Sequence, residues 1–192
     1  AAREVLEKGE PRLVRFGDDE GEASCCGGTL EIYIEPILSS PTLYVCGAGH
    51  VGQYVAEAGH MAGFRVVVAD DREELANRER FPAAGEILVG PLPHILQSLV
   101  ISSSSYIVIV RGHDQDGDIL GWAARTPARY IGMIGSRSKV TGVLNDLEAQ
   151  GISRERLEQV KAPIGLDIGA ETPQEIAIAV MAEIIKARRG KG

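Results

Sequence analysis

The stretch that decides the fold is CGAGHVG, residues 46–52. It places a G-x-G-x-x-G pattern directly after an apolar run and at the start of a segment with helical periodicity. In a strand–turn–helix unit, Gly47 permits the tight turn, Gly49 lets a pyrophosphate approach the backbone, and Gly52 allows close packing of the helix. A turn whose glycines serve packing alone is the alternative interpretation. The other positions of the predicted binding turn are Ala48, His50 and Val51.

Two acids support a nucleotide-type ligand at this turn. Asp70 and Asp71 end the next apolar run, 21 and 22 residues after Gly49. An acid at this place hydrogen-bonds a ribose 2′-hydroxyl and disfavours a 2′-phosphate. We therefore predict that Asp70 or Asp71 contacts the ribose of a bound dinucleotide.

The remainder of residues 41–192 alternates β-branched runs with amphipathic segments. Strands that are apolar on both faces, separated by helices, are typical of a parallel sheet with crossover connections. The pattern therefore predicts an α/β fold with a doubly wound parallel sheet. The predicted strands are 42–46, 64–69, 86–89, 106–110 and 130–134. The predicted helices are 50–62, 72–80, 92–98, 118–125, 136–150, 153–160 and a final one that Thr172, Pro173 and Glu175 begin.

The first forty residues follow a different pattern. Residues 30–34 (LEIYI) alternate like a strand with one wet face, and Ser39-Ser40-Pro41 is typical of a short linker. We predict two domains, a short β-containing segment at 1–40 that is the remnant of another unit, and the sheet domain at 41–192. A single strand cannot form its own core, so we expect it to pack in a homodimer or, alternatively, against a partner protein.

Three further loops follow predicted strands, at the edge where an open α/β sheet binds ligands. Arg111-Gly112-His113-Asp114 offers a histidine that serves as a base or hydrogen-bond donor, or is simply exposed. Gly135-Ser136-Arg137-Ser138-Lys139 combines backbone amides, hydroxyls and cations that suit an anion, or else forms an ordinary cap. In PIGLDIG, residues 163–169, Asp167 either points into a cleft or satisfies loop amides.

Cysteine and histidine positions predict no metal site, because the four histidines are scattered and no C-x-x-C occurs. A G-x-S-x-G elbow is also missing, which argues against a serine hydrolase. Cys46 ends a buried strand and is expected in the core. The thiols of Cys25-Cys26-Gly27-Gly28 stand beside two glycines, and this accessible position suits a nucleophile or a sulfur acceptor.

Charge and composition exclude several classes of protein. The 20 Lys and Arg against 27 Asp and Glu give a net charge of −7, which disfavours a nucleic-acid partner. No apolar run approaches the roughly 20 residues that span a bilayer, and residues 1–10 are too polar for a signal peptide. We expect a soluble cytoplasmic protein. Its 23 glycines exceed the usual share and concentrate in the motifs above.

Five of these segments together resemble the XdhC/CoxI family, the accessory factors of xanthine dehydrogenase and related molybdenum hydroxylases. They are CGAGHVG, VVVADDRxE, RGHD, YIGMIGSRSK and PIGLDIGAETPQEIAIAVMAEI. The resemblance implies a Rossmann-like domain that binds molybdenum cofactor, assists its sulfuration with a cysteine desulfurase, and delivers it to an apo-hydroxylase.

Carried onto this sequence, the resemblance implies a nucleotide-type site at Gly47, Gly49, Gly52 and Asp70. It implies a pterin-phosphate site at Gly135, Ser136 and Arg137. Cys26 corresponds to the family's Cys-Gly-Gly, although this sequence has a second cysteine, Cys25, beside it. The family's usual N-terminal domain is also longer than the segment present here.

We carry three functional hypotheses from the sequence. The first is a maturation factor that binds molybdenum cofactor, with or without NAD(P), and docks on a hydroxylase. The second is an NAD(P)-dependent oxidoreductase with His113 as its proton donor or acceptor. The third is a regulatory domain that senses a nucleotide through Gly47, Gly49 and Asp70.

Overall fold

The computed structural model describes residues 1–8, 11–16, 30–35, 40–112 and 115–190. The chain divides into two compact units, Ala1–Ser39 and Ser40–Gly192. The smaller unit pairs β1 (Arg12–Phe16) antiparallel with β2 (Leu30–Ile34) and includes α1 (Ala2–Lys8). The predicted strand at 30–34 is confirmed, whereas β1 and α1 were not predicted. That this unit is the remnant of a longer domain stays a prediction.

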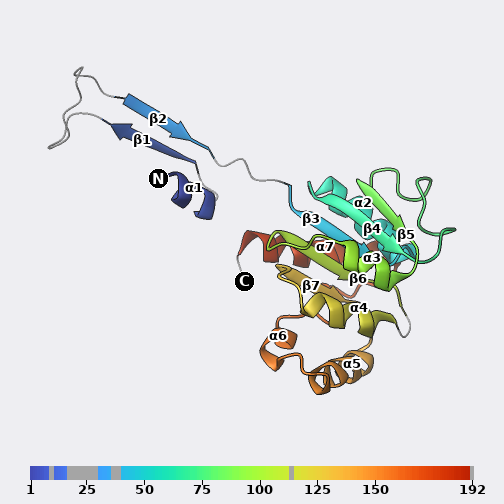
Figure 1. Ribbon diagram of the computed structural model, residues 1–192. Coiled ribbons are helices and arrows are strands. Elements are labelled where there is room, and N and C mark those ends of the chain that lie inside the picture. Colours follow the sequence, from blue (N-terminus) through green and yellow to red (C-terminus); the bar gives the residue numbers. More distant parts are fainter. Residues whose placement is uncertain (9–10, 17–29, 36–39, 113–114, 191–192) are drawn as a thin grey trace. The chain divides into compact units, whose positions relative to one another are not determined.

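The larger unit contains a parallel sheet of five strands in the order β5-β4-β3-β6-β7 (Figure 1). This order, with helices on both faces, confirms the predicted α/β Rossmann-like fold. The strands are β3 (Thr42–Cys46), β4 (Arg65–Asp70), β5 (Glu86–Val89), β6 (Ser105–Ile109) and β7 (Tyr130–Met133). The helices are α2 (His50–Met61), α3 (Leu92–Ser98), α4 (Gln115–Ala124), α5 (Arg137–Ala149), α6 (Arg154–Glu158) and α7 (Pro173–Arg189).

Alternation along each strand divides the core into two layers. In β3, Leu43 and Val45 face a layer completed by α2 and α7, while Tyr44 and Cys46 face the layer of α3 to α6. Cys46 is buried as predicted, and burial raises the pKa of its thiol to about 12. The Cys46 thiol is therefore protonated at neutral pH and is no nucleophile.

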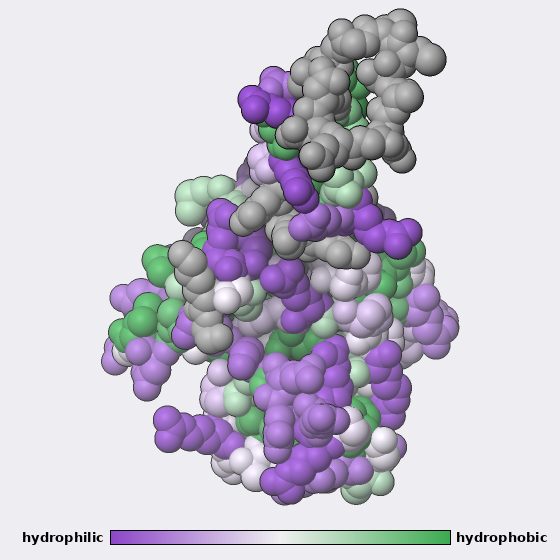
Figure 2. Space-filling model, turned by 90° about the vertical axis from the view of Figure 1, so that its left-hand side faces the viewer, coloured by the Kyte–Doolittle hydropathy of each residue, from purple (hydrophilic) through white to green (hydrophobic). Residues whose placement is uncertain are grey.

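The surface is mostly polar on the face that Figure 2 shows, where apolar side chains of the described residues lie in small patches among hydrophilic ones. Among the described residues, no helix is both long and apolar enough to cross a membrane.

The prediction of a helix at 72–80 is wrong. This segment forms turns. Single i→i−4 hydrogen bonds from the amides of Ala76 and Phe81 do not extend into a helix, and side-chain hydrogen bonds hold the shape of the segment. Arg72 binds Asp70, the Arg78 guanidinium donates to the carbonyl of Ala84, and Arg80 Nη2 donates to Gln53 Oε1 at 3.0 Å. The remaining predicted helices are present, α4 beginning three residues earlier than expected.

The last helix, α7, begins with the predicted capping box. Thr172 Oγ1 accepts from the Glu175 amide at 3.3 Å, and Glu175 Oε2 accepts from the Thr172 amide at 2.9 Å. These backbone hydrogen bonds, with one from the amide of Glu171, lower the pKa of Glu175. The start of α7 is thus set by local interactions that a short motif specifies.

We expect Thr172→Ala to lower the free energy of unfolding by about 1 kcal/mol, because the substitution removes the cap acceptor. Urea denaturation measures this change. Thr141→Ala is the matched control, since Thr141 Oγ1 donates to the carbonyl of Arg137 within α5, at 2.9 Å, and caps no helix start. An equal loss in the two variants would contradict a special role for the cap.

Candidate functional site

The carboxyl ends of β3 and β6 form the topological switch point of the sheet. The two strands are neighbours, and the chain continues from β3 into α2 on one face and from β6 into α4 on the other. Connections that diverge in this way leave a crevice at the edge of the sheet, where open α/β folds bind ligands. The turn at 46–52 and the loop that begins at Arg111 both lie here.

Two of the three motif glycines are required by packing. Gly47 has a φ of +126°, and a Cβ on it would lie 2.5 Å from the backbone nitrogen of Arg111. A Cβ on Gly52 would lie 1.9 Å from the carbonyl oxygen of Gly47. Gly52 therefore packs α2 against the turn itself, and neither position accepts a larger residue.

Gly49 is different, because a Cβ built on it meets no atom within 4 Å. It is the N-cap of α2, has extended backbone angles, and makes no side-chain cap hydrogen bond. The first turn of α2 thus faces open space beside Gly49, and an anion can approach the backbone there. This is the position that the sequence predicted for close approach of a pyrophosphate.

Asp70 is fully buried and ties the turn to the end of β4. Its Oδ2 accepts from the backbone amide of Ala48 at 2.6 Å and from Arg72 Nη2 at 2.7 Å. Its Oδ1 accepts from the amide and Nε of Arg72, at 2.9 and 2.8 Å. Both carboxylate oxygens therefore accept hydrogen bonds from the protein itself, and Asp70 holds the turn at 46–52 in place.

The ionisation of Asp70 follows from these contacts. Burial by itself raises its pKa, but the side-chain hydrogen bonds from Arg72 and the backbone amides of Ala48 and Arg72 outweigh burial. They hold the pKa of Asp70 at about 2, below its ordinary value of 3.8. The carboxylate is thus charged throughout the physiological range.

Asp71, the second predicted acid, keeps 31% of its side chain exposed. Its Oδ1 accepts from Arg111 Nε at 2.9 Å, and the same Nε lies 3.7 Å from Asp70 Oδ1. Arg111 therefore joins the ends of β4 and β6 across the crevice. Of the two predicted ribose ligands, Asp71 is the accessible one.

The loop after β6 is held by an acid that the sequence did not single out. Asp116, fully buried in the first turn of α4, accepts from the amide of Gly112 at 3.0 Å and from Lys139 Nζ at 2.6 Å. An acid in a first helical turn is common on surfaces, so the sequence carried no signal of its burial. His113 and Asp114 lie outside the described residues, as do Cys25, Cys26 and their two glycines.

The segment after β7 separates the groups that were predicted to converge on an anion. Ser136 Oγ accepts from the Lys139 amide at 3.3 Å and caps α5, beside Gly135. Lys139 is paired with Asp116, whereas Arg137 is exposed. Arg137 is therefore the cation of this segment that can meet a ligand.

Arg137 and Asp167 line one cavity of about 360 Å³ with the loop at 163–170. The loop is attached to β7 and to α7, since the Ile164 amide donates to the carbonyl of Met133 at 3.0 Å and the Gly165 amide donates to Glu183 Oε2 at 2.9 Å. Tyr130 Oη on β7 donates to Glu183 Oε1 at 2.8 Å. Arg137, after β7, and Asp167, before α7, thus line the same cavity. Among the described residues, no cluster of His, Cys, Asp and Glu suits a metal ion.

The sheet order and the glycine turn at its switch point define a Rossmann-type α/β protein. Residues 43–184 match the model of the XdhC Rossmann domain. The chain therefore belongs to the XdhC family.

The chain is also similar to two proteins of Escherichia coli (strain K12). The chain is 34% identical over 191 residues to YqeB of Escherichia coli (strain K12), covering 96% of this chain and 35% of that protein. It is 31% identical over 102 residues to the molybdenum cofactor insertion chaperone PaoD of the same strain, covering 50% of this chain and 32% of PaoD. The chain thus spans about a third of each of these two relatives.

A solved structure supports the fold. The crystal structure of a xanthine dehydrogenase from Bacillus halodurans superposes with a TM-score of 0.71 at 26% identity. The match covers 85% of this chain and 48% of that one.

We expect Asp70→Asn to lower the free energy of unfolding at neutral pH by about 2 kcal/mol, because a shift from 3.8 to about 2 corresponds to that energy. The native pKa is lowered, so this stabilisation is present above pH 3.8 and is lost as pH falls towards about 2. Denaturation across this range should show a flatter pH dependence for Asp70→Asn than for the wild type.

Arg72→Met removes the side-chain donors but keeps the backbone ones, so its pH dependence should lie between those of the wild type and Asp70→Asn. Identical slopes in all three proteins would refute the role of these contacts.

Proposed function

We propose that this chain is the Rossmann part of a maturation factor that holds molybdenum cofactor at the carboxyl edge of the sheet for delivery to a molybdenum hydroxylase. The observation that carries the proposal is the open approach at Gly49 at one end of this edge, with the Arg137 cavity at the other. Membership of the XdhC family supports it, as do the insertion role in the name of PaoD and the structure of a xanthine dehydrogenase.

The residues present fit a phosphorylated pterin. A phosphate is bound by a guanidinium and by backbone amides at a helix start, which Arg137 and the first turn of α5 after Gly135 and Ser136 supply. Asp167 lines the same cavity and offers an acceptor for the amino and ring N–H groups of a pterin. The cavity also has apolar walls from Ile164, Leu166 and Ile168, which suit a flat ring.

A dinucleotide is the second candidate ligand, and Gly49 favours it. A pyrophosphate would lie against Gly49, His50 and Val51, while Asp71 would accept a ribose hydroxyl in place of the buried Asp70. NAD(P) is thus proposed either as a co-ligand or as the ligand of an oxidoreductase or a nucleotide sensor. The oxidoreductase also needs His113.

We further propose a role for one cysteine and two associations with other protein chains. Cys26 would accept sulfur from a cysteine desulfurase, the apo-hydroxylase would receive the finished cofactor, and the factor would act as a homodimer.

Gly49→Ala tests the binding turn. Its added methyl group enters open space, so we expect an unchanged melting temperature and at least tenfold weaker binding of the ligand whose phosphate lies there. Anaerobic calorimetric titrations with isolated molybdenum cofactor, NAD and NADP identify that ligand. Tight NAD binding without affinity for the molybdenum cofactor would overturn the maturation role.

Gly52→Ala is the structural counterpart of that variant. Its methyl group would overlap the Gly47 carbonyl, so we expect a loss of about 3 kcal/mol in the free energy of unfolding.

Arg137→Ala should weaken binding of the molybdenum cofactor about tenfold, because one charge-assisted hydrogen bond to a phosphate is lost. Arg154→Ala is the control, since Arg154 on α6 lies outside the cavity lining and pairs with the exposed Glu158. The same titrations measure both variants. Unchanged affinity in Arg137→Ala would remove Arg137 from the site.

A further inference from the structure

Helix α7 has an exposed apolar line on the side that faces away from the sheet. Ile178 is 60% exposed and Ile185 is 36% exposed, while Val180 and Ile184 on the opposite side are buried in the core. At 3.6 residues per turn, Ile178, Ala182 and Ile185 lie within about 60° of one another around the helix. Apolar side chains in such a line cost free energy while they face water.

The two ends of this line carry opposite charges. Glu175 lies in the first turn of α7, with Glu171 just before it, and Arg189 and Lys186 lie in the last turn. These four residues are exposed. Between the charged ends, the small residue Ala182 lies midway between Glu175 and Arg189 in the sequence.

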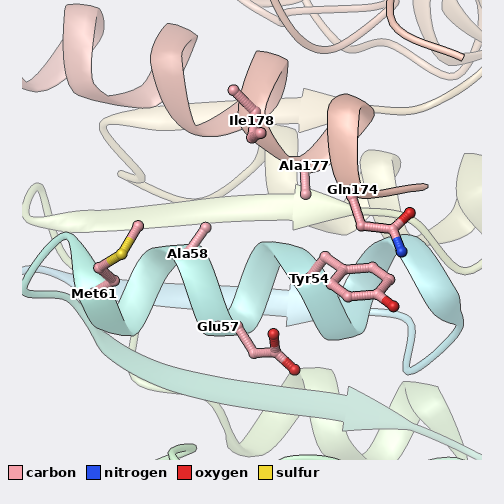
Figure 3. A pocket seen from close by; sticks show the side chains of 7 residues that line it. All are labelled: Tyr54, Glu57, Ala58, Met61, Gln174, Ala177 and Ile178. Carbon is pink, nitrogen blue, oxygen red and sulfur yellow. The ribbon is translucent and has the colours of Figure 1, made fainter. Parts of the chain in front are cut away.

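The apolar surface widens where α2 lies beside α7 (Figure 3). The two helices run in the same direction, and Arg188 Nη1 near the end of α7 donates to the carbonyl of Ala62 after α2 at 3.0 Å. The groove between them has a volume of about 270 Å³, and Met61 on its rim is 84% exposed. Ile178 of α7 also lines this groove.

We propose that a second copy of this chain docks on this face, with α7 antiparallel to α7 and a two-fold axis passing near Ala182. A two-fold interface uses the same patch on both copies, so the patch must be complementary to itself. Antiparallel packing places Ile178 opposite Ile185 of the second copy and the acidic first turn opposite the basic last turn. Ala182 at the axis lets the two helices approach closely.

Charge makes this orientation specific. Parallel packing of the two helices would place acid beside acid at one end and base beside base at the other, which is unfavourable. The exposed apolar side chains on this face are few, so we expect the association to depend on concentration. None of the residues on this face belongs to the crevice, so the association does not depend on which ligand the crevice binds.

Sedimentation of the full chain over a range of concentrations tests the interface. We expect a species of twice the 20.5 kDa chain mass in the wild type and a monomer in Ile178→Asp. Val100→Asp is the control, because Val100 is 84% exposed in the loop between α3 and β6. A wild type that stays monomeric, or a dimer that survives Ile178→Asp, would overturn the proposal.

Charge reversal tests the orientation by the same measurement. Arg189→Glu places acids opposite acids in the antiparallel dimer and should weaken association about tenfold. Adding Glu175→Arg, at the position that faces 189 across an axis at Ala182, restores opposite charges and should recover most of the loss. A double variant as weak as Arg189→Glu would argue against the antiparallel register.

Disulfide trapping then locates the axis, in a Cys25→Ser, Cys26→Ser background that removes the competing thiols. Ala182→Cys should form a disulfide-linked dimer on oxidation, because the two positions meet at the axis. Gln174→Cys should not, since a rise of 1.5 Å per residue separates its two copies by roughly 24 Å, far beyond the reach of a disulfide. Efficient linkage through position 174 would mean a different packing.

Discussion

The bond between the buried Asp70 carboxylate and the Ala48 amide is the constraint on which the crevice depends. It fastens the glycine-rich turn after β3 to the end of β4, and Arg72 holds the same carboxylate in its charged form. A buried charge persists only when its partners compensate for lost hydration. The position of the turn, and so the open approach at Gly49, follows from this compensated charge.

The features that the sequence predicted well are those set by neighbours in the chain. The glycine turn and the capping box of α7 are encoded within a few residues, so their geometry can be inferred without knowing the fold. The buried strands are similar, because an apolar β-branched run such as residues 106–110 has few other stable places. Residues 72–80 show the limit of this approach. Their helix propensity is high, yet contacts with Asp70, Gln53 and Ala84 decide their shape.

The sequence predicts where the candidate site lies, but it does not predict the role of each residue in the site. Strand ends identify the edge of the sheet, so the loops at 46–52, 111–114, 135–139 and 163–169 could be assigned to it. Which acid is buried and which is accessible depends on packing across the crevice, and the sequence treats Asp70 and Asp71 alike. Similarly, the pairing of Lys139 with Asp116 joins residues 23 apart and leaves Arg137 as the available cation.

Helix α7 covers one face of the sheet and, through Glu183, also holds the loop at 163–170. One side of the helix holds the cavity loop, through Glu183 to Gly165 and through the Ala179 carbonyl to the Leu166 amide at 3.2 Å. Its other side presents Ile178 and Ile185 to solvent. Because α7 is a rigid helix, a shift of its exposed face also shifts the residues that hold the cavity loop. By thermodynamic linkage, any molecule that repositions α7 from outside changes the affinity of the cavity, and a cavity ligand changes the affinity for that molecule by an equal factor.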